Sequence, residues 1–168
     1  MSDGSRVPPE GESAPDFELP SGPDSTLSLS SLRGRPVVLV FYPADWSPVC
    51  GDQLALYQAL IDEFEAFDAQ LVGISVDGPW CHKAYREHRN LSFPLLSDFE
   101  PKGEVSRRYG AYRAQDGFSE RALFVLDPNG AITWSEVVAP QVNPGADGIL
   151  NALAEMSSAG VGGAPAAS

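Results

Sequence analysis

The sequence predicts one α/β domain with a central mixed β-sheet flanked by helices, and three observations support this prediction. Strand patterns alternate with helical patterns along the chain. Short runs of β-branched and aromatic residues, such as PVVLVFY at 36–42, are typical of strands buried on both faces. A tight turn at 127–130 (DPNG) joins two neighbouring strand patterns. The alternation favours parallel neighbours and the hairpin requires an antiparallel pair, so the sheet is expected to be mixed.

The first elements follow from local periodicity. Phe17 and Leu19, then Leu27 and Leu29, alternate with polar residues around a turn at 21–24, which predicts a small hairpin. The strand 36–42 comes next. The segment 52–67 has apolar residues at helical spacing and is expected to form one helix; these residues are Leu54, Tyr57, Leu60, Ile61, Phe64 and Phe67.

The second half of the chain continues the alternation. Pro79 suits the first turn of a helix, and Gly110 suits the end of one. The expected order is a strand at 69–77, a helix at 79–90, a strand at 92–98, a helix at 101–110, strands at 121–127 and 131–138, and a last helix within 144–156.

Composition limits the domain organisation. A chain of 168 residues holds one domain with a full core. Residues 1–12 are rich in Gly, Pro, Ser and Glu and are expected to be flexible, and residues 157–168 are small and uncharged, which predicts a disordered tail. The folded domain is therefore expected to span 13–156, without internal repeats.

Charge and cysteine content exclude several classes of function. The formal net charge of -12 argues against nucleic acid and anionic membranes as partners, because both bind through basic patches. There is no apolar window long enough to span a membrane and no signal-peptide pattern at the N-terminus, so a cytoplasmic protein is expected. Cys50 and Cys81 are too few for a disulfide framework and lack zinc-site spacing, so no metal is expected.

Cys50 is the first candidate functional residue. It follows the buried strand 36–42, at the sheet edge where ligands gather in α/β domains. It also falls where the loop passes into the next helix, and unpaired N–H groups at a helix start favour a reactive thiolate. The alternative is a small buried apolar residue, which suits the middle of a strand better than a proline-rich loop.

The run FYPADWSPVC resembles the active-site signature of peroxiredoxins, Pro-x-x-x-Thr/Ser-x-x-Cys, matched by Pro43, Ser47 and Cys50. Arg121 in SERALFVLDPNG matches the Arg that the family carries on a later strand. APDFELP, LVGISVD and FPLLSD also match, so the resemblance covers about residues 13–155. It is closest to the atypical two-cysteine bacterioferritin-comigratory type or the one-cysteine type.

This resemblance implies a thioredoxin-like fold and a thiol-dependent peroxidase without a cofactor. The enzyme would reduce hydrogen peroxide and organic hydroperoxides through a sulfenic acid at Cys50. A thiol reductant such as thioredoxin would recycle it, and a homodimer is implied. Two alternatives stay open: a thiol-disulfide oxidoreductase that uses Cys50 and Cys81, and a peroxide-sensing redox switch.

The resemblance gives each signature residue a role. Cys50 would attack the peroxide, Ser47 would hold a peroxide oxygen, and Arg121 would stabilise the thiolate and the developing charge. Pro43 would fix the loop and shield the thiol. Ser47 could instead be only a turn and helix cap, and Arg121 an ordinary surface cation. Many family members have Glu where this chain has Gln53, which can hold an Arg by hydrogen bonding but without a charge.

Cys81, near the start of the helix 79–90, is the only partner for Cys50 within the chain. The resemblance makes it a possible resolving cysteine that would form a disulfide with Cys50. The alternative is a packing residue beside Trp80 and Tyr85 in a one-cysteine enzyme. His82 and His88 are expected to be surface or helix-end residues rather than catalysts.

Overall fold

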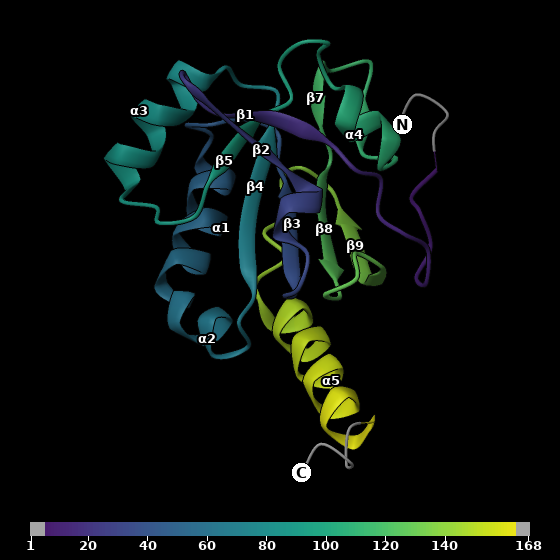
Figure 1. Cartoon of the computed structure of the whole chain (residues 1–168). Helices are drawn as coiled ribbons and strands as arrows, with labels where there is room; N and C mark the ends of the chain where they lie inside the picture. Colours follow the sequence, from purple (N-terminus) through teal and green to yellow (C-terminus); the bar gives the residue numbers. More distant parts are fainter. Residues whose placement is uncertain (1–5, 164–168) are drawn as a thin grey trace.

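A five-stranded mixed sheet forms the centre of the computed structural model, which describes the backbone of residues 6–163 and side chains through residue 159 (Figure 1). The strand order is β5-β4-β3-β8-β9. β3, β4 and β5 are parallel to one another, whereas β8 runs antiparallel to β3 and to β9. The bounds are β3 Val37–Phe41, β4 Gln70–Ser75, β5 Leu95–Ser97, β8 Arg121–Leu126 and β9 Ile132–Val138. The predicted mixed sheet is confirmed.

Helices cover both faces of this sheet. One face is covered by α1 (Pro48–Ala59), α2 (Ile61–Ala66), α3 (Pro79–Arg89) and α5 (Asp147–Gly163). The other face is covered by α4 (Glu104–Arg108) and by the N-terminal hairpin. The hairpin consists of β1 (Glu18–Gly22) and β2 (Ser25–Ser28), followed by a 3-10 turn at Leu29–Leu32; a second small hairpin pairs β6 (Tyr112–Arg113) with β7 (Phe118–Ser119).

The sequence of β3 explains this two-sided burial. All five residues of β3 are buried, and alternate side chains enter opposite cores: Val38 and Val40 on the face of α1, Val37, Leu39 and Phe41 on the face of α4. Because strand side chains alternate in direction, an unbroken apolar run is what a strand between two helical layers requires. The prediction for this segment is confirmed.

Two expected boundaries are wrong. The expected helix 52–67 begins earlier, at Pro48, and divides at Leu60, where φ is -101° and ψ is 16°. The Leu60 N–H donates to the carbonyls of both Leu56 and Tyr57, which tightens the last turn of α1. α5 continues to Gly163, seven residues into the expected tail, because extending a helix costs less than nucleating one. The rest of that expected tail, 164–168, lies outside the described residues.

The N-terminal segment also differs from the expectation of a flexible segment at 1–12. The Gly11 N–H donates to the Ile132 carbonyl at 2.8 Å, and the Ile132 N–H donates to the Glu12 carbonyl at 2.9 Å. These bonds satisfy backbone groups at the edge of β9, a long-range pairing that local composition does not reveal. Residues 1–5 of that expected segment lie outside the described part of the chain.

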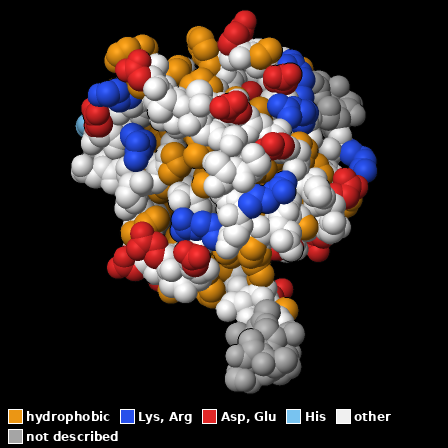
Figure 2. All heavy atoms as spheres, viewed as in Figure 1, with side chains coloured by type: hydrophobic (Ala, Val, Ile, Leu, Met, Phe, Trp, Pro, Cys, Tyr) orange, Lys and Arg blue, Asp and Glu red, His pale blue; other side chains and the backbone are white. Residues whose placement is uncertain are grey.

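The surface agrees with the charge pattern of the sequence. On the face in Figure 2, basic side chains stand among acidic and neutral ones, so this face has no broad basic patch. Within residues 6–163, no helix is both long enough and apolar enough to cross a membrane.

Candidate functional site

Cys50 lies in the first turn of α1, directly after the loop that leaves β3. Pro48 occupies the start of the helix, and Ser47 is its N-cap, accepting a hydrogen bond from the Cys50 N–H at 3.3 Å. Pro supplies a helical φ without an N–H to satisfy, and Ser pairs an N–H that would lack a partner. The capping role considered for Ser47 is therefore present. The bond uses the hydroxyl oxygen as an acceptor and leaves the O–H free to donate.

The Arg121 guanidinium lies against the Cys50 sulfur. β8 starts at Arg121 beside the end of β3, where Ala122 pairs with Phe41. Nη1 of Arg121 is 3.4 Å from the Cys50 Sγ, and both side chains are fully buried. Nε and Nη2 donate to the Pro140 carbonyl, which fixes the plane of the guanidinium. Arg121 is thus not the surface cation of the alternative reading, but a buried charge facing the thiol.

Gln53 anchors this arginine without a charge. Its Oε1 accepts from Nη1 of Arg121 at 2.7 Å, as its position in the sequence suggested, and its Nε2 donates to the Tyr57 hydroxyl at 3.0 Å. Tyr57 in turn donates to the Gly145 carbonyl at 2.9 Å. Burial raises the pKa of Tyr57 to about 12, so the hydroxyl keeps the proton that this bond needs. The chain of bonds ties the arginine to α1 and to the loop before α5.

The loop before α1 contacts α3. Pro43 is buried at its start. Trp46 has φ of 73°, a left-handed conformation that is uncommon for a residue other than glycine. Its ring is half exposed and makes an edge contact with Tyr85 of α3 at 4.9 Å, and it also lies 5.3 Å from His88. The loop is therefore held against α3 by its aromatic side chain.

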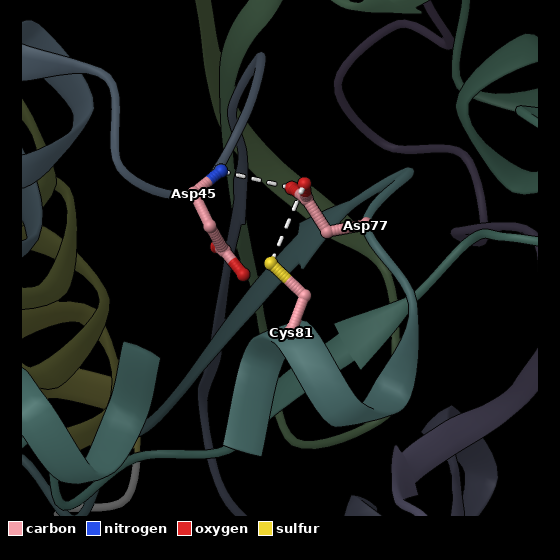
Figure 3. Close-up of side chains that lie close together, drawn as sticks. All are labelled: Asp45, Asp77 and Cys81. Carbon is pink, nitrogen blue, oxygen red and sulfur yellow. Dashed lines mark hydrogen bonds between the residues drawn. The ribbon is translucent and has the colours of Figure 1, made fainter. Parts of the chain in front are cut away.

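Cys81 lies in the first turn of α3 and is partly exposed. Figure 3 shows its sulfur facing Asp77, with Asp45 on the neighbouring loop. The Cys81 Sγ is 4.0 Å from Asp77 Oδ1. The atoms that could bind a metal ion, this sulfur and one carboxylate oxygen each of Asp45 and Asp77, lie within 4.8 Å of one another. Burial and then the negative charges of Asp45 and Asp77 raise the pKa of Cys81 to about 11. In the reduced protein Cys81 is therefore a thiol near neutral pH.

Asp45 and His82 form a buried pair that the sequence reasoning missed. Oδ2 of Asp45 lies 2.7 Å from Nδ1 of His82, and Oδ1 accepts from the Tyr42 hydroxyl at 2.6 Å. Nε2 of His82 lies 3.0 Å from the Leu96 carbonyl. The expectation of a surface position is wrong for His82, which is 2% exposed, and right for His88, which is exposed. The sequence signal for burial of His82 is its three-residue spacing from Tyr85, which places both residues on one face of the helix.

Hydrogen bonds within the protein explain how Asp45 and Asp77 lie close together, beside Cys81, without a cation between them. Both oxygens of Asp45 already face protein donors. Oδ2 of Asp77 accepts from the Ser75 hydroxyl at 2.5 Å and from the Asp45 N–H at 2.9 Å. Since these carboxylate oxygens are engaged by the protein, a metal ion would have to displace several hydrogen bonds to bind there.

Comparisons with known proteins show which family the chain resembles. A model of the AhpC/TSA family matches residues 11–135. The chain is 37% identical over 131 residues to alkyl hydroperoxide reductase E of Mycobacterium tuberculosis, covering 77% of this chain and 86% of that protein. It is 34% identical over 147 residues to alkyl hydroperoxide reductase C of the same organism, covering 85% of this chain and 74% of that protein.

Solved structures are similar over nearly the whole chain. The crystal structure of Enterococcus faecalis AhpC superposes with a TM-score of 0.83 at 25% identity, covering 92% of this chain and 95% of that one. The crystal structure of peroxidoxin BcpB from Mycobacterium tuberculosis gives a TM-score of 0.77 at 31% identity, covering 88% of this chain and 97% of that one.

Proposed function

The chain belongs to the AhpC/TSA family of peroxiredoxins and is a thiol-dependent peroxidase with a thioredoxin-like fold; from that premise, we propose which residues carry the reaction. Cys50 is the peroxidatic thiol. The observation that carries this assignment is the 3.4 Å contact between its sulfur and Nη1 of a fully buried Arg121. A permanent cation against a sulfur at a helix start stabilises negative charge at the reacting atom, and the thiolate is the form that attacks a peroxide.

The reaction is a displacement at oxygen. The Cys50 thiolate attacks one oxygen of ROOH, an S–O bond forms and the O–O bond breaks. The sulfur loses two electrons and becomes a sulfenic acid, and the leaving RO⁻ takes a proton to give ROH. Arg121 stabilises the charge that builds on the peroxide, and the Ser47 hydroxyl donates to a peroxide oxygen. Pro43 keeps bulk water from the thiol, and Gln53 holds Arg121 in place.

We propose that Cys81 then resolves the sulfenic acid. The Cys81 sulfur attacks the Cys50 sulfur, a disulfide forms, and water leaves with the thiol proton and the hydroxyl group. The topology supports this role, because β3 and β4 are parallel neighbours and each cysteine lies in the first turn of the helix that follows its strand. A disulfide needs Cα atoms within about 7 Å, so we expect local unwinding of a helix start.

The substrates, the reductant, the oligomeric state and the cellular location are also proposals. A peroxiredoxin consumes a hydroperoxide and a thiol reductant, and we propose hydrogen peroxide and organic hydroperoxides as substrates and thioredoxin or a similar thiol protein as the reductant. A homodimer and a cytoplasmic location are proposed from the family resemblance and the sequence.

Peroxide consumption with a thioredoxin system tests these assignments in the intact protein, Cys50→Ser and Cys81→Ser, with mass spectrometry of the oxidised forms. We expect no turnover in Cys50→Ser, and in the intact protein a disulfide between the two cysteines. Unchanged turnover in Cys50→Ser would refute the mechanism. Full turnover in Cys81→Ser, with no such disulfide in the intact protein, would refute only the resolving role.

The same experiment separates the alternative functions. Exchange with protein disulfides and little peroxide consumption would indicate a thiol-disulfide oxidoreductase. Oxidation of Cys50 without efficient turnover would indicate a redox switch.

A further inference from the structure

Tyr85 is a buried tyrosine in the same core as Cys50. It lies on α3 and is 0% exposed, and the core cluster that contains it also contains Cys50 and Tyr42. The Trp46 ring lies 4.9 Å from its ring, and the Arg89 guanidinium carbon lies 5.7 Å from the ring centre. The side chain is therefore fixed by aromatic and cation contacts next to the loop that carries the thiol.

The hydroxyl of Tyr85 has no hydrogen-bond partner among the described residues, although it is buried. The other three fully buried tyrosines all donate through their hydroxyls: Tyr42 to Asp45 at 2.6 Å, Tyr57 to Gly145 at 2.9 Å and Tyr109 to Pro15 at 2.6 Å. Burying a hydroxyl without a hydrogen-bond partner costs free energy, and such hydroxyls are rare in folded proteins. Tyr85 departs from a rule that its three counterparts follow.

The charge of Cys50 also acts on this hydroxyl. Burial raises the pKa of Tyr85 to about 12, the Arg89 charge opposes that rise, and the negative charges of Asp45 and Cys50 add to it. The Trp46 N–H lies close enough to lower the pKa slightly, but it makes no hydrogen bond of acceptable geometry, and an N–H could not accept the tyrosine proton in any case. The Tyr85 hydroxyl is therefore a protonated donor without an acceptor.

We propose that Tyr85 donates a hydrogen bond to the oxygen that peroxide leaves on Cys50. In the reduced protein the hydroxyl has no acceptor among the described residues. When the thiolate takes an oxygen atom from ROOH and ROH departs, a polar oxygen appears on the sulfur, and Tyr85 stabilises the sulfenic acid. This inference rests on the proposed peroxidatic role of Cys50. It makes Tyr85 a catalytic residue of the oxidised state, idle in the reduced one.

The test compares Tyr85→Phe with a matched control, Tyr109→Phe, both in the Cys81→Ser background so that the sulfenic acid is not resolved within the chain. Each protein receives one equivalent of hydrogen peroxide, and the Cys50 sulfenic acid is trapped with dimedone at timed intervals and measured by mass spectrometry. Thermal unfolding of the reduced proteins is measured alongside.

For Tyr85→Phe we expect a sulfenic acid lifetime roughly two- to tenfold shorter, the range that one net hydrogen bond gives. We expect its reduced form to be at least as stable as the parent, since it loses no bond. Tyr109→Phe should show the opposite result: a lower unfolding temperature, because it loses the bond to Pro15, and an unchanged sulfenic acid lifetime.

An unchanged lifetime in Tyr85→Phe overturns the inference, and so does a loss of reduced-state stability as large as that of Tyr109→Phe. The proposed function fails separately, through a parent protein that forms no Cys50 sulfenic acid at all.

Discussion

The Asp45 carboxylate lies 2.7 Å from Nδ1 of His82 in a site where both side chains are almost fully buried. The pair joins two segments far apart in the sequence: the loop that leads to Cys50 and the helix that carries Cys81. Any movement that brings the two sulfurs together has to preserve this bond or break it.

Replacing His82 with Phe should strongly destabilise the protein. The substitution leaves Asp45 Oδ2 and the Leu96 carbonyl without their partner, and a buried charge that loses its partner costs about 3–5 kcal/mol. The free energy of unfolding in urea measures this loss. The control is His88→Phe on the same helix, which is exposed and should change the free energy by no more than about 0.5 kcal/mol. Similar losses in both variants would contradict the importance of the buried pair.

Ser47→Asn should separate the two roles of Ser47. Asn caps a helix about as well as Ser, so the free energy of unfolding should change by less than about 0.5 kcal/mol. The hydroxyl is replaced by an amide whose N–H groups lie one bond farther from the backbone, so the positioned donor is lost, and the rate constant for peroxide should fall roughly a hundredfold. Stopped-flow kinetics with hydrogen peroxide measures it, with Ser47→Thr as the variant that keeps the hydroxyl. Equal rates for Asn and Thr would reduce Ser47 to a helix cap.

Arg121→Lys should lower the peroxide rate constant by roughly a hundredfold or more, although the positive charge remains. A lysine ammonium cannot reach Cys50, Gln53 and the Pro140 carbonyl at once, as the planar guanidinium does. The matched control is Arg35→Lys, which lies before β3 at the opposite end of that strand and should react at the parental rate. A parental rate in Arg121→Lys would show that charge alone is sufficient.

Cys81 should be alkylated slowly at neutral pH, and its rate should rise with pH, with a midpoint near pH 11. Its pKa is raised from 9.0 to about 11, so between these values the unfolded chain ionises the thiol more readily than the folded one. The contribution of this group to stability is therefore complete below pH 9 and is lost as the pH rises toward 11. Iodoacetamide labelling of Cys81, followed by mass spectrometry, gives the profile.

Asp77→Asn should shift this alkylation profile to lower pH, because it removes one of the negative charges that oppose ionisation of Cys81. The midpoint should stay above that of a free thiol, since burial is the largest cause. Asp62→Asn, at an exposed position on α2, is the control and should leave the profile unchanged. An unchanged alkylation profile in Asp77→Asn would show that this carboxylate does not influence the ionisation of Cys81.

The parts of the fold that sequence reasoning predicted depend on local patterns. β3 and β4 are short apolar runs, and the body of α1 has apolar residues at helical spacing, although its start at Pro48 lies four residues before the expected one. Cys50 and Arg121, 71 residues apart, could be placed together only through the family resemblance, because the spacing of two residues does not define a contact.

The features that were missed depend on tertiary contacts. The pairing of Gly11 and Glu12 with Ile132 uses only backbone groups, which carry no side-chain signature. The surface position expected for His82 is wrong because its partners, Asp45 and the Leu96 carbonyl, come from two other segments of the chain. The raised pKa of Cys81 likewise arises from carboxylates brought close by folding.

The position of Trp46 gives the protein an optical reporter. The indole lies four residues before Cys50 and touches Tyr85, so unwinding the first turn of α1 would part the two rings and change the tryptophan emission. Trp80 is 72% exposed, and Trp134 lies against Gly148 of α5. With both of these replaced by Phe, a single emitter would follow each oxidation and reduction of Cys50 in real time, without a label.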